Sequence, residues 1–332
     1  MTPRRRAIRA AALIVAAVVV LGACSSGDDA GTAAPTTAAS PDGLVAVAAS
    51  FDVAVGRPRR FLVGLFSEDH GNVGYGTVEF NFSYLGTDRA EGDPRPGPSA
   101  TASFLPVPGS EPPTPPPGPA FLRPSEGRGV YAADAGFGQP GIWEVEVTAD
   151  LVDGGTVRAT SLFEVLPAHR VPAEGDVAPQ SENLTVDSPG VPMSAIDSRA
   201  SDVEPVPDPE LHGTTIAEAV RTGRPALVVF STPTFCVSRF CGPVTDMVGG
   251  LAADYADRAS FIHVEVWRDF EAQQLNDTAA EWLTPNGAEG NEPWVFLIGA
   301  DGRIAARWDN VATPGEITAE LERLPVIGPA SG

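Results

Sequence analysis

Two cysteines, Cys236 and Cys241, are the residues of this sequence best suited to chemistry. A cysteine thiolate is a nucleophile, and the start of a helix favours the thiolate because backbone N–H groups and the helix dipole stabilise negative charge. Cys241 stands directly before Gly242-Pro243, where a helical pattern begins, so we expect it to be the nucleophile and Cys236 its partner. Arg239 would favour either thiolate. The pair is predicted to act in thiol–disulfide exchange or to form a structural disulfide.

The segment around these cysteines alternates between helical and strand patterns. Thr214 or Thr215 can cap a helix that runs to about Arg221, and Thr313 and Glu316 form a capping-box pattern that opens a last helix. The expected strands are the apolar runs 225–230, 261–266, 294–298 and 303–308, and a second helix is expected at 243–255. The predicted order is helix, strand, helix, strand, helix, strand, strand, helix.

With these elements in place, residues from about 211 to 324 resemble a thioredoxin-fold domain. An apolar strand ends at Phe230, a short loop leads to Cys236, Cys241-Gly242-Pro243 opens a helix, and Pro293 directly precedes the strand 294–298. The resemblance implies an α/β domain at 210–326, a cis-proline at Pro293 that packs beside the sulfurs and aligns a client, and thiol–disulfide oxidoreductase activity.

The sequence departs from the family pattern in two ways. Four residues separate the cysteines instead of two, so loop length makes Cys236 the family's first cysteine, whereas the Gly-Pro that follows points to Cys241. The family's buried acid is also missing, because the strand from Ala226 to Phe230 is wholly apolar. Glu265 or Asp246 could replace it, although a surface position is the default for both.

Two other thioredoxin-like chemistries fit the sequence less well. Copper-delivery relatives use two cysteines and a distant histidine, but only His263 is near enough, and its place within an apolar strand is typical of an ordinary strand residue. Peroxide-reducing relatives place a threonine three residues before the reactive cysteine, where this chain has Pro233 or Ser238. No metal and no cofactor are expected.

The preceding half of the chain, residues 43–167, shows the two-residue period of antiparallel strands with one polar face. Examples are Phe61–Phe66, the alternation from Val78 to Tyr84, and the stretch from Gly141 to Val147, which resembles late strands of immunoglobulin-like domains. Residues 92–129 hold so many prolines that we expect a solvated loop inserted into this β-sandwich, since proline is excluded from central strands. Residues 168–209 lack a sustained period and are expected to be a linker.

The N-terminus has the layout of a lipoprotein signal. Four arginines precede a short apolar run that ends in Leu21-Gly22-Ala23-Cys24, which resembles the bacterial lipobox. We therefore expect a signal peptide at 1–23, a lipid on Cys24 and a flexible tether at 24–42. These features predict a protein anchored by lipid to the outer face of the cell membrane, where disulfides persist.

The net charge is −21 and becomes −25 when the four arginines of the signal peptide are removed. Such an acidic chain is not expected to bind nucleic acid. The sequence predicts a multidomain protein with an all-β immunoglobulin-like sandwich followed by an α/β thioredoxin-like domain. Its predicted function is a membrane-tethered thiol–disulfide oxidoreductase acting on client thiols or disulfides through Cys236, Cys241 and Pro293. The alternative is a non-enzymatic envelope lipoprotein with a redox-inert module and a partner-binding sandwich.

Overall fold

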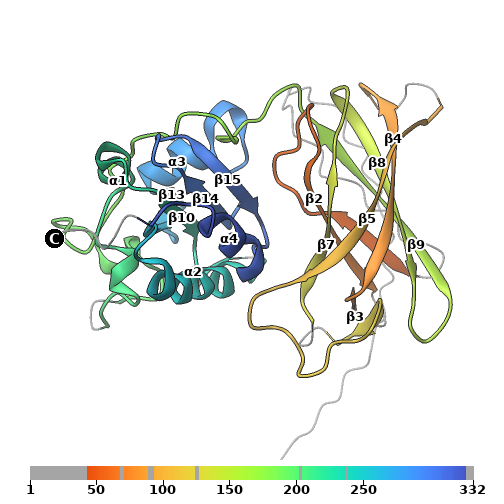
Figure 1. The fold of residues 1–332 in the computed structure, drawn as a ribbon, viewed down its shortest axis with the longest axis horizontal. Coiled ribbons are helices and arrows are strands. Elements are labelled where there is room, and N and C mark those ends of the chain that lie inside the picture. Colours follow the sequence, from red (N-terminus) through yellow and green to blue (C-terminus); the bar gives the residue numbers. More distant parts are fainter. Residues whose placement is uncertain are drawn as a thin grey trace, which may run out of the picture. The chain divides into compact units, whose positions relative to one another are not determined.

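The structure, a computed structural model, describes residues 43–67, 71–88, 93–123, 127–201, 204–236 and 238–326. The expected signal peptide (1–23), the lipid site Cys24 and the tether (24–42) lie outside these residues. The described part is mostly β, with several sheets and four α-helices. Figure 1 shows a large antiparallel sheet and, after it in the sequence, a smaller mixed sheet flanked by helices.

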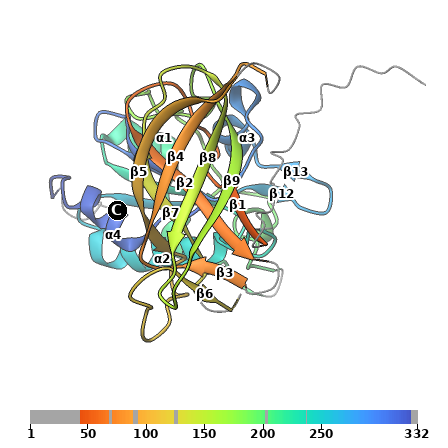
Figure 2. The same cartoon turned by 90° about the vertical axis from the view of Figure 1, so that its right-hand side faces the viewer.

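The larger sheet has nine strands, and all of its pairings are antiparallel. Its order is β6-β3-β2-β7-β5-β4-β8-β9, with β1 paired to β2, and Figure 2 shows β5, β4, β8 and β9 as neighbours. The strands are β1 (Leu44–Ala48), β2 (Arg59–Ser67), β3 (Gly71–Gly74), β4 (Thr77–Gly86), β5 (Arg95–Pro106), β6 (Ala120–Leu122), β7 (Gly129–Ala135), β8 (Gly141–Asp150) and β9 (Thr156–Val165).

The two-residue period of the sequence correctly predicts which face of these strands is buried. On β4, Val78, Phe80, Phe82 and Tyr84 are buried while most residues between them are more exposed. Aromatic side chains from several strands meet in one core, where Phe61 and Phe82 pack edge to face with centroids 5.2 Å apart. This sheet therefore has the half-buried, alternating strands that the sequence pattern indicates.

Residues 107–119 of the expected loop at 92–129 have no helix or strand, but residues 95–106 form the twelve-residue strand β5 between β4 and β7, and residues 120–122 form β6. Two of its three prolines, Pro96 and Pro98, lie in the half of the strand that pairs only with β4, and the third, Pro106, is its last residue. Pro96 and Pro98 lie beside the register shift opposite Asn81 and Ser83, and β7 pairs only with Ser103–Pro106. The proline-bearing half of β5 thus has a single neighbour, which is the situation in which a strand tolerates proline.

The smaller sheet has the strand order β11-β10-β14-β15. Its central strand β10 is buried at all six positions, runs parallel to β11 and is antiparallel to β14. The strands are β10 (Ala226–Ser231), β11 (Ser260–Glu265), β14 (Trp294–Ile298) and β15 (Ile304–Asp309), and a separate hairpin pairs β12 (Trp267–Asp269) with β13 (Gln274–Leu275). The expected strands and their order are confirmed to within one or two residues.

Helices cover both faces of this sheet, as Figure 1 shows. Helices α1 (Ile216–Thr222) and α3 (Asp277–Leu283) pack on one face, with Trp282 of α3 against Phe230 and Phe296. Helices α2 (Cys241–Tyr255) and α4 (Pro314–Leu321) pack on the other face. Thr215 caps α1, and Thr313 and Glu316 form the predicted capping box of α4. Helix α2 begins at Cys241, two residues earlier than expected.

Residues 168–209, expected to be a linker, contain buried side chains and the 3-10 helix η1 (Met193–Ala195), and a second 3-10 helix, η2 (Pro209–Leu211), begins at the end of the segment. Val171 and Ala178 join the core on the α1 side of the mixed sheet, and Ile196, Ala200 and Val206 form a small cluster of their own. Much of this segment has neither helical nor strand geometry. Its order comes from packing and hydrogen bonds that produce no period in the sequence.

No helix in the described ranges is long and apolar enough to cross a membrane.

Candidate functional site

The candidate site lies where β10 ends and α2 begins. The chain leaves β10 at Ser231 and turns so that the Cys236 N–H donates to the Thr232 carbonyl at 3.1 Å. Helix α2 is attached to the end of β10 by hydroxyl groups, because Ser231 Oγ lies 2.6 Å from Thr245 Oγ1, which donates to the Cys241 carbonyl at 2.8 Å. This short network fixes the first turn of α2 against the central strand.

Cys236 and Cys241 form a disulfide with their Cα atoms 6.0 Å apart. The two sulfur-bearing residues differ in exposure: Cys241 is completely buried at the first position of α2, whereas Cys236 is partly exposed. The sulfur of Cys236 also lies 3.2 Å from the hydroxyl of Ser238. Cys236 is therefore the more accessible of the two cysteines, whereas the helix start favours a thiolate at Cys241.

Pro293 lies at the same end of the mixed sheet as the cysteine loop. Trp294, the first residue of β14, pairs with Phe230, so Pro293 precedes β14 at the level where β10 gives way to the loop. The Glu292–Pro293 peptide bond is cis, and the Pro293 carbonyl accepts a hydrogen bond from the Asn310 N–H at 2.9 Å. The strand register thus brings the three expected site residues to one edge of the sheet.

Glu265 supplies a buried acid at this edge. It is 1% exposed at the end of β11, opposite Ser231 of β10. Its carboxylate accepts hydrogen bonds from the Thr232 hydroxyl at 2.6 Å and from the Ser198 N–H at 2.7 Å. Burial raises the pKa of Glu265. The expectation of a surface position for this residue was wrong, whereas Asp246 is exposed and pairs with Arg199 at 2.7 Å.

Glu292, which the sequence reasoning missed, is a second acid at this edge. Burial, followed by the charge of Glu265, raises the pKa of Glu292 to about 7, against the opposing effect of hydrogen bonds with Thr232. One carboxyl oxygen of Glu292 is buried without a hydrogen-bond partner. Its position directly before Pro293 was the signal that could have indicated it. Thr232 contacts both Glu265 and Glu292. Its carbonyl also accepts the hydrogen bond from the Cys236 N–H, so Thr232 connects the two carboxyl groups to the cysteine loop.

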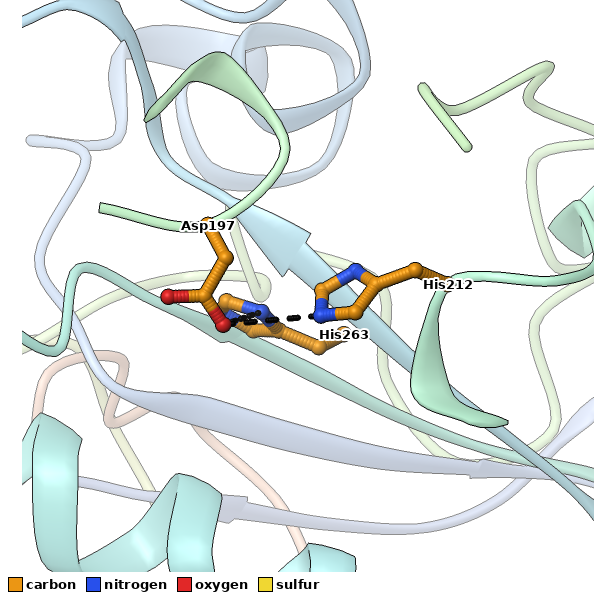
Figure 3. Close-up of side chains that lie close together, drawn as sticks. All are labelled: Asp197, His212 and His263. Atoms are coloured by element: carbon orange, nitrogen blue, oxygen red, sulfur yellow. Dashed lines mark ion pairs between the residues drawn. The ribbon is translucent and has the colours of Figure 1, made fainter. Parts of the chain in front are cut away.

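A separate polar cluster is made by Asp197, His212 and His263, which Figure 3 shows turned toward one another. Asp197 follows η1, His212 follows η2, and His263 lies within β11. Among the described residues this is the one group of three or more side chains whose donor atoms are close enough to hold a metal ion. The sequence indicated His263 as an ordinary strand residue and gave no signal for the other two.

Comparisons with protein-family models, with curated proteins and with solved structures found no match for this chain.

Proposed function

We propose that this chain is a thiol–disulfide oxidoreductase that uses the Cys236–Cys241 pair. The observation that carries the proposal is the asymmetry of the disulfide: one cysteine is partly exposed, and the other is buried at the start of a helix. Exchange requires one sulfur that a client reaches and a second sulfur that resolves the mixed disulfide. A thioredoxin-like fold for the mixed-sheet region, and an immunoglobulin-like sandwich before it, are part of the same proposal.

The exchange follows from this asymmetry. A client thiolate attacks the Cys236 sulfur, the bond to Cys241 breaks, and the Cys241 sulfur leaves as a thiolate that takes up a proton. A second client thiolate then attacks the client sulfur of the mixed disulfide and releases Cys236. The client loses two electrons and becomes a disulfide, while Cys236 and Cys241 become thiols; the reverse sequence reduces a client disulfide. We therefore assign the client-facing role to Cys236, in place of the Cys241 nucleophile favoured by sequence.

The buried Glu265 and the partly buried Glu292 support this chemistry, because the buried sulfur must gain or lose a proton in each cycle. A carboxyl with a pKa of about 7, such as that of Glu292, exchanges protons readily near neutral pH. Glu265 is linked to the same loop through Thr232. These acids would take the place of the acid that the thioredoxin family carries on its first core strand; Glu265 is the last residue of β11, and Glu292 lies two residues before β14 begins.

Single-cysteine variants test the proposal. Both variants are made in the full-length chain carrying C24S and are purified in detergent. C241S leaves the partly exposed Cys236, and C236S leaves the buried Cys241. Each is mixed with a disulfide-bonded model peptide, and the mixed disulfide is measured by mass. The proposal predicts that C241S reacts at least about tenfold faster than C236S, because access to the attacked and attacking sulfurs controls the rate.

A variant that simply unfolds would expose either cysteine, so each is checked by circular dichroism before the reaction. Equal slow reaction of two folded variants would contradict the proposal and favour the redox-inert lipoprotein. Turnover of the unsubstituted pair with a peptide dithiol is the second readout, and its absence would lead to the same conclusion.

We also propose that the protein is tethered by a lipid on Cys24 to the outer face of the cell membrane. The support is the signal-like sequence that ends at Cys24 and the presence of a disulfide, which is typical of oxidising compartments. Growth with labelled palmitate tests this point. The chain is expected to carry label, and C24S is expected to lose it; label retained by C24S would refute the lipid site.

A further inference from the structure

The cluster of Asp197, His212 and His263 is buried far more completely than polar side chains usually are. Asp197 and His212 are 0% exposed and His263 is 1% exposed. Asp197 Oδ2 lies 3.4 Å from His212 Nε2 and 3.4 Å from His263 Nδ1, and the three donor atoms all lie within 4.8 Å of one another (Figure 3). Because three segments of the chain supply these residues, the cluster is a product of the tertiary fold.

The hydrogen bonds of the two imidazoles are incomplete. His263 Nε2 lies 3.0 Å from the Ser231 carbonyl, which can only accept, so this nitrogen carries the proton of the neutral ring. A neutral His263 then directs the lone pair of Nδ1 at the carboxylate of Asp197, which also has only lone pairs to offer. Neither ring nitrogen of His212 has a hydrogen-bond partner, and neither does His263 Nδ1. Leaving such buried groups unsatisfied is costly.

A metal ion would satisfy two of these nitrogens, His212 Nε2 and His263 Nδ1, together with the carboxylate of Asp197. For bonds of 2.0–2.2 Å to nitrogen and oxygen, tetrahedral coordination places the ligand atoms about 3.3–3.6 Å apart. Both oxygen–nitrogen separations in the cluster, at 3.4 Å, fall in that range. Without an ion, protons on His263 Nδ1 and His212 Nε2 would reach Asp197 Oδ2 only across 3.4 Å, which is longer than the roughly 2.7–3.2 Å of an ordinary N–H···O hydrogen bond.

The surrounding charges also suit a divalent cation. Arg199 holds Asp197 through its Nη2 at 2.7 Å and bonds to Asp208 at 2.9 Å and to Asp246 at 2.7 Å. Three carboxylates thus contact one guanidinium. When both imidazoles are neutral, the cluster together with Arg199, Asp208 and Asp246 therefore carries a net charge of −2. Glu265 adds a further acid near His263.

We propose that Asp197 Oδ2, His212 Nε2 and His263 Nδ1 form a closed binding site for one Zn²⁺ ion. Two neutral imidazoles and one carboxylate are ligands that zinc accepts, with a water molecule as the fourth. Second-shell contacts hold the ligands: the Ser231 carbonyl fixes the ring of His263, and the Arg199 N–H donates to Asp197 Oδ1 at 2.8 Å. Because the site is sealed from solvent, its role is structural: the ion would fasten η1 and η2, with the segment between them, to β11.

This inference does not depend on the redox proposal, because it uses neither cysteine. Full-length oxidised protein is treated with a chelator, dialysed and titrated with ZnCl₂ alone, and bound zinc is counted by mass spectrometry of the metal. One zinc ion per chain and a higher melting temperature with zinc are the expected results. Failure of the unsubstituted chain to bind zinc tightly would overturn the proposal.

Matched variants locate the ion. We expect H212A to lose the zinc and H169A to retain it, since His169 lies outside the cluster and pairs with Asp52 at 3.0 Å. A variant lacking both Cys236 and Cys241 must also retain zinc. Equal zinc in H212A, or its loss with the cysteines, would refute the site.

Should H212A fail to fold, Co²⁺ replaces Zn²⁺ in the unsubstituted protein. Visible bands of a tetrahedral nitrogen and oxygen site would support the proposal, whereas thiolate charge-transfer bands or octahedral Co²⁺ would refute it.

Discussion

Replacing Glu292 by glutamine tests the role of this partly buried acid beside the cysteine loop. The folded protein raises the pKa of Glu292 from 4.5 to about 7, mainly through burial, so the folded state binds this proton more tightly than the unfolded state. The tighter binding of this proton by the folded state stabilises the fold fully below pH 4.5, and this stabilisation is lost as the pH rises through 7. At 1.36 kcal/mol for each pH unit, ionisation of Glu292 lowers the free energy of unfolding by about 3 kcal/mol.

Glutamine resembles the protonated acid in shape and cannot ionise. We therefore expect E292Q and the unsubstituted protein to have similar free energies of unfolding at pH 4. Above pH 7 we expect E292Q to be more stable by about 3 kcal/mol. Urea unfolding followed by near-ultraviolet circular dichroism, at half-unit steps from pH 4 to pH 8, measures this difference.

The matched control is E289Q, which removes an exposed acid three residues earlier in the chain. It is expected to unfold like the unsubstituted protein at every pH, because its side chain is exposed to solvent. A stability difference for E292Q that does not change with pH, or one that favours the glutamate above pH 7, would refute the reasoning.

Two further substitutions test contacts near the site and in the mixed-sheet fold. T232V removes the hydroxyl that donates to Glu265 at 2.6 Å and should lower the free energy of unfolding by about 1–3 kcal/mol. T232S keeps a hydroxyl and should retain most of that stability. Equal loss of stability in both variants would show that the hydroxyl is unimportant. T313A removes the capping box of α4 and should cost about 1 kcal/mol in urea unfolding, compared with little effect for T318A, whose hydroxyl makes only an exposed contact. Equal stability of T313A and T318A would contradict the assigned cap.

Local patterns predicted much of the fold because the contacts that determine it leave regular periods in the sequence. The alternation on β4 and the apolar run of β10 indicated a half-buried and a fully buried strand, and both assignments were confirmed. The strand β5 was missed because the cost of proline depends on whether its missing N–H would have had a partner. Only the register with β4 and β7 answers that question.

The candidate site was predictable in part. The disulfide between Cys236 and Cys241 follows from the presence of two cysteines five positions apart, and the structure contains that bond. Glu265 and Glu292 were harder to identify, because burial of an acid is set by neighbours distant in sequence. Asp197 and His212 belong to a segment without any period, and they approach His263 only after that segment packs on the mixed sheet.

The most direct test of the central claim is the redox equilibrium of the Cys236–Cys241 pair. Full chain carrying C24S is equilibrated with glutathione and dithiothreitol buffers, and the free thiols are counted after alkylation. A reduction potential near thioredoxin's roughly −270 mV or above, together with exchange with a model disulfide, is the result the account predicts. A potential below about −300 mV with no exchange would identify a structural disulfide and contradict it.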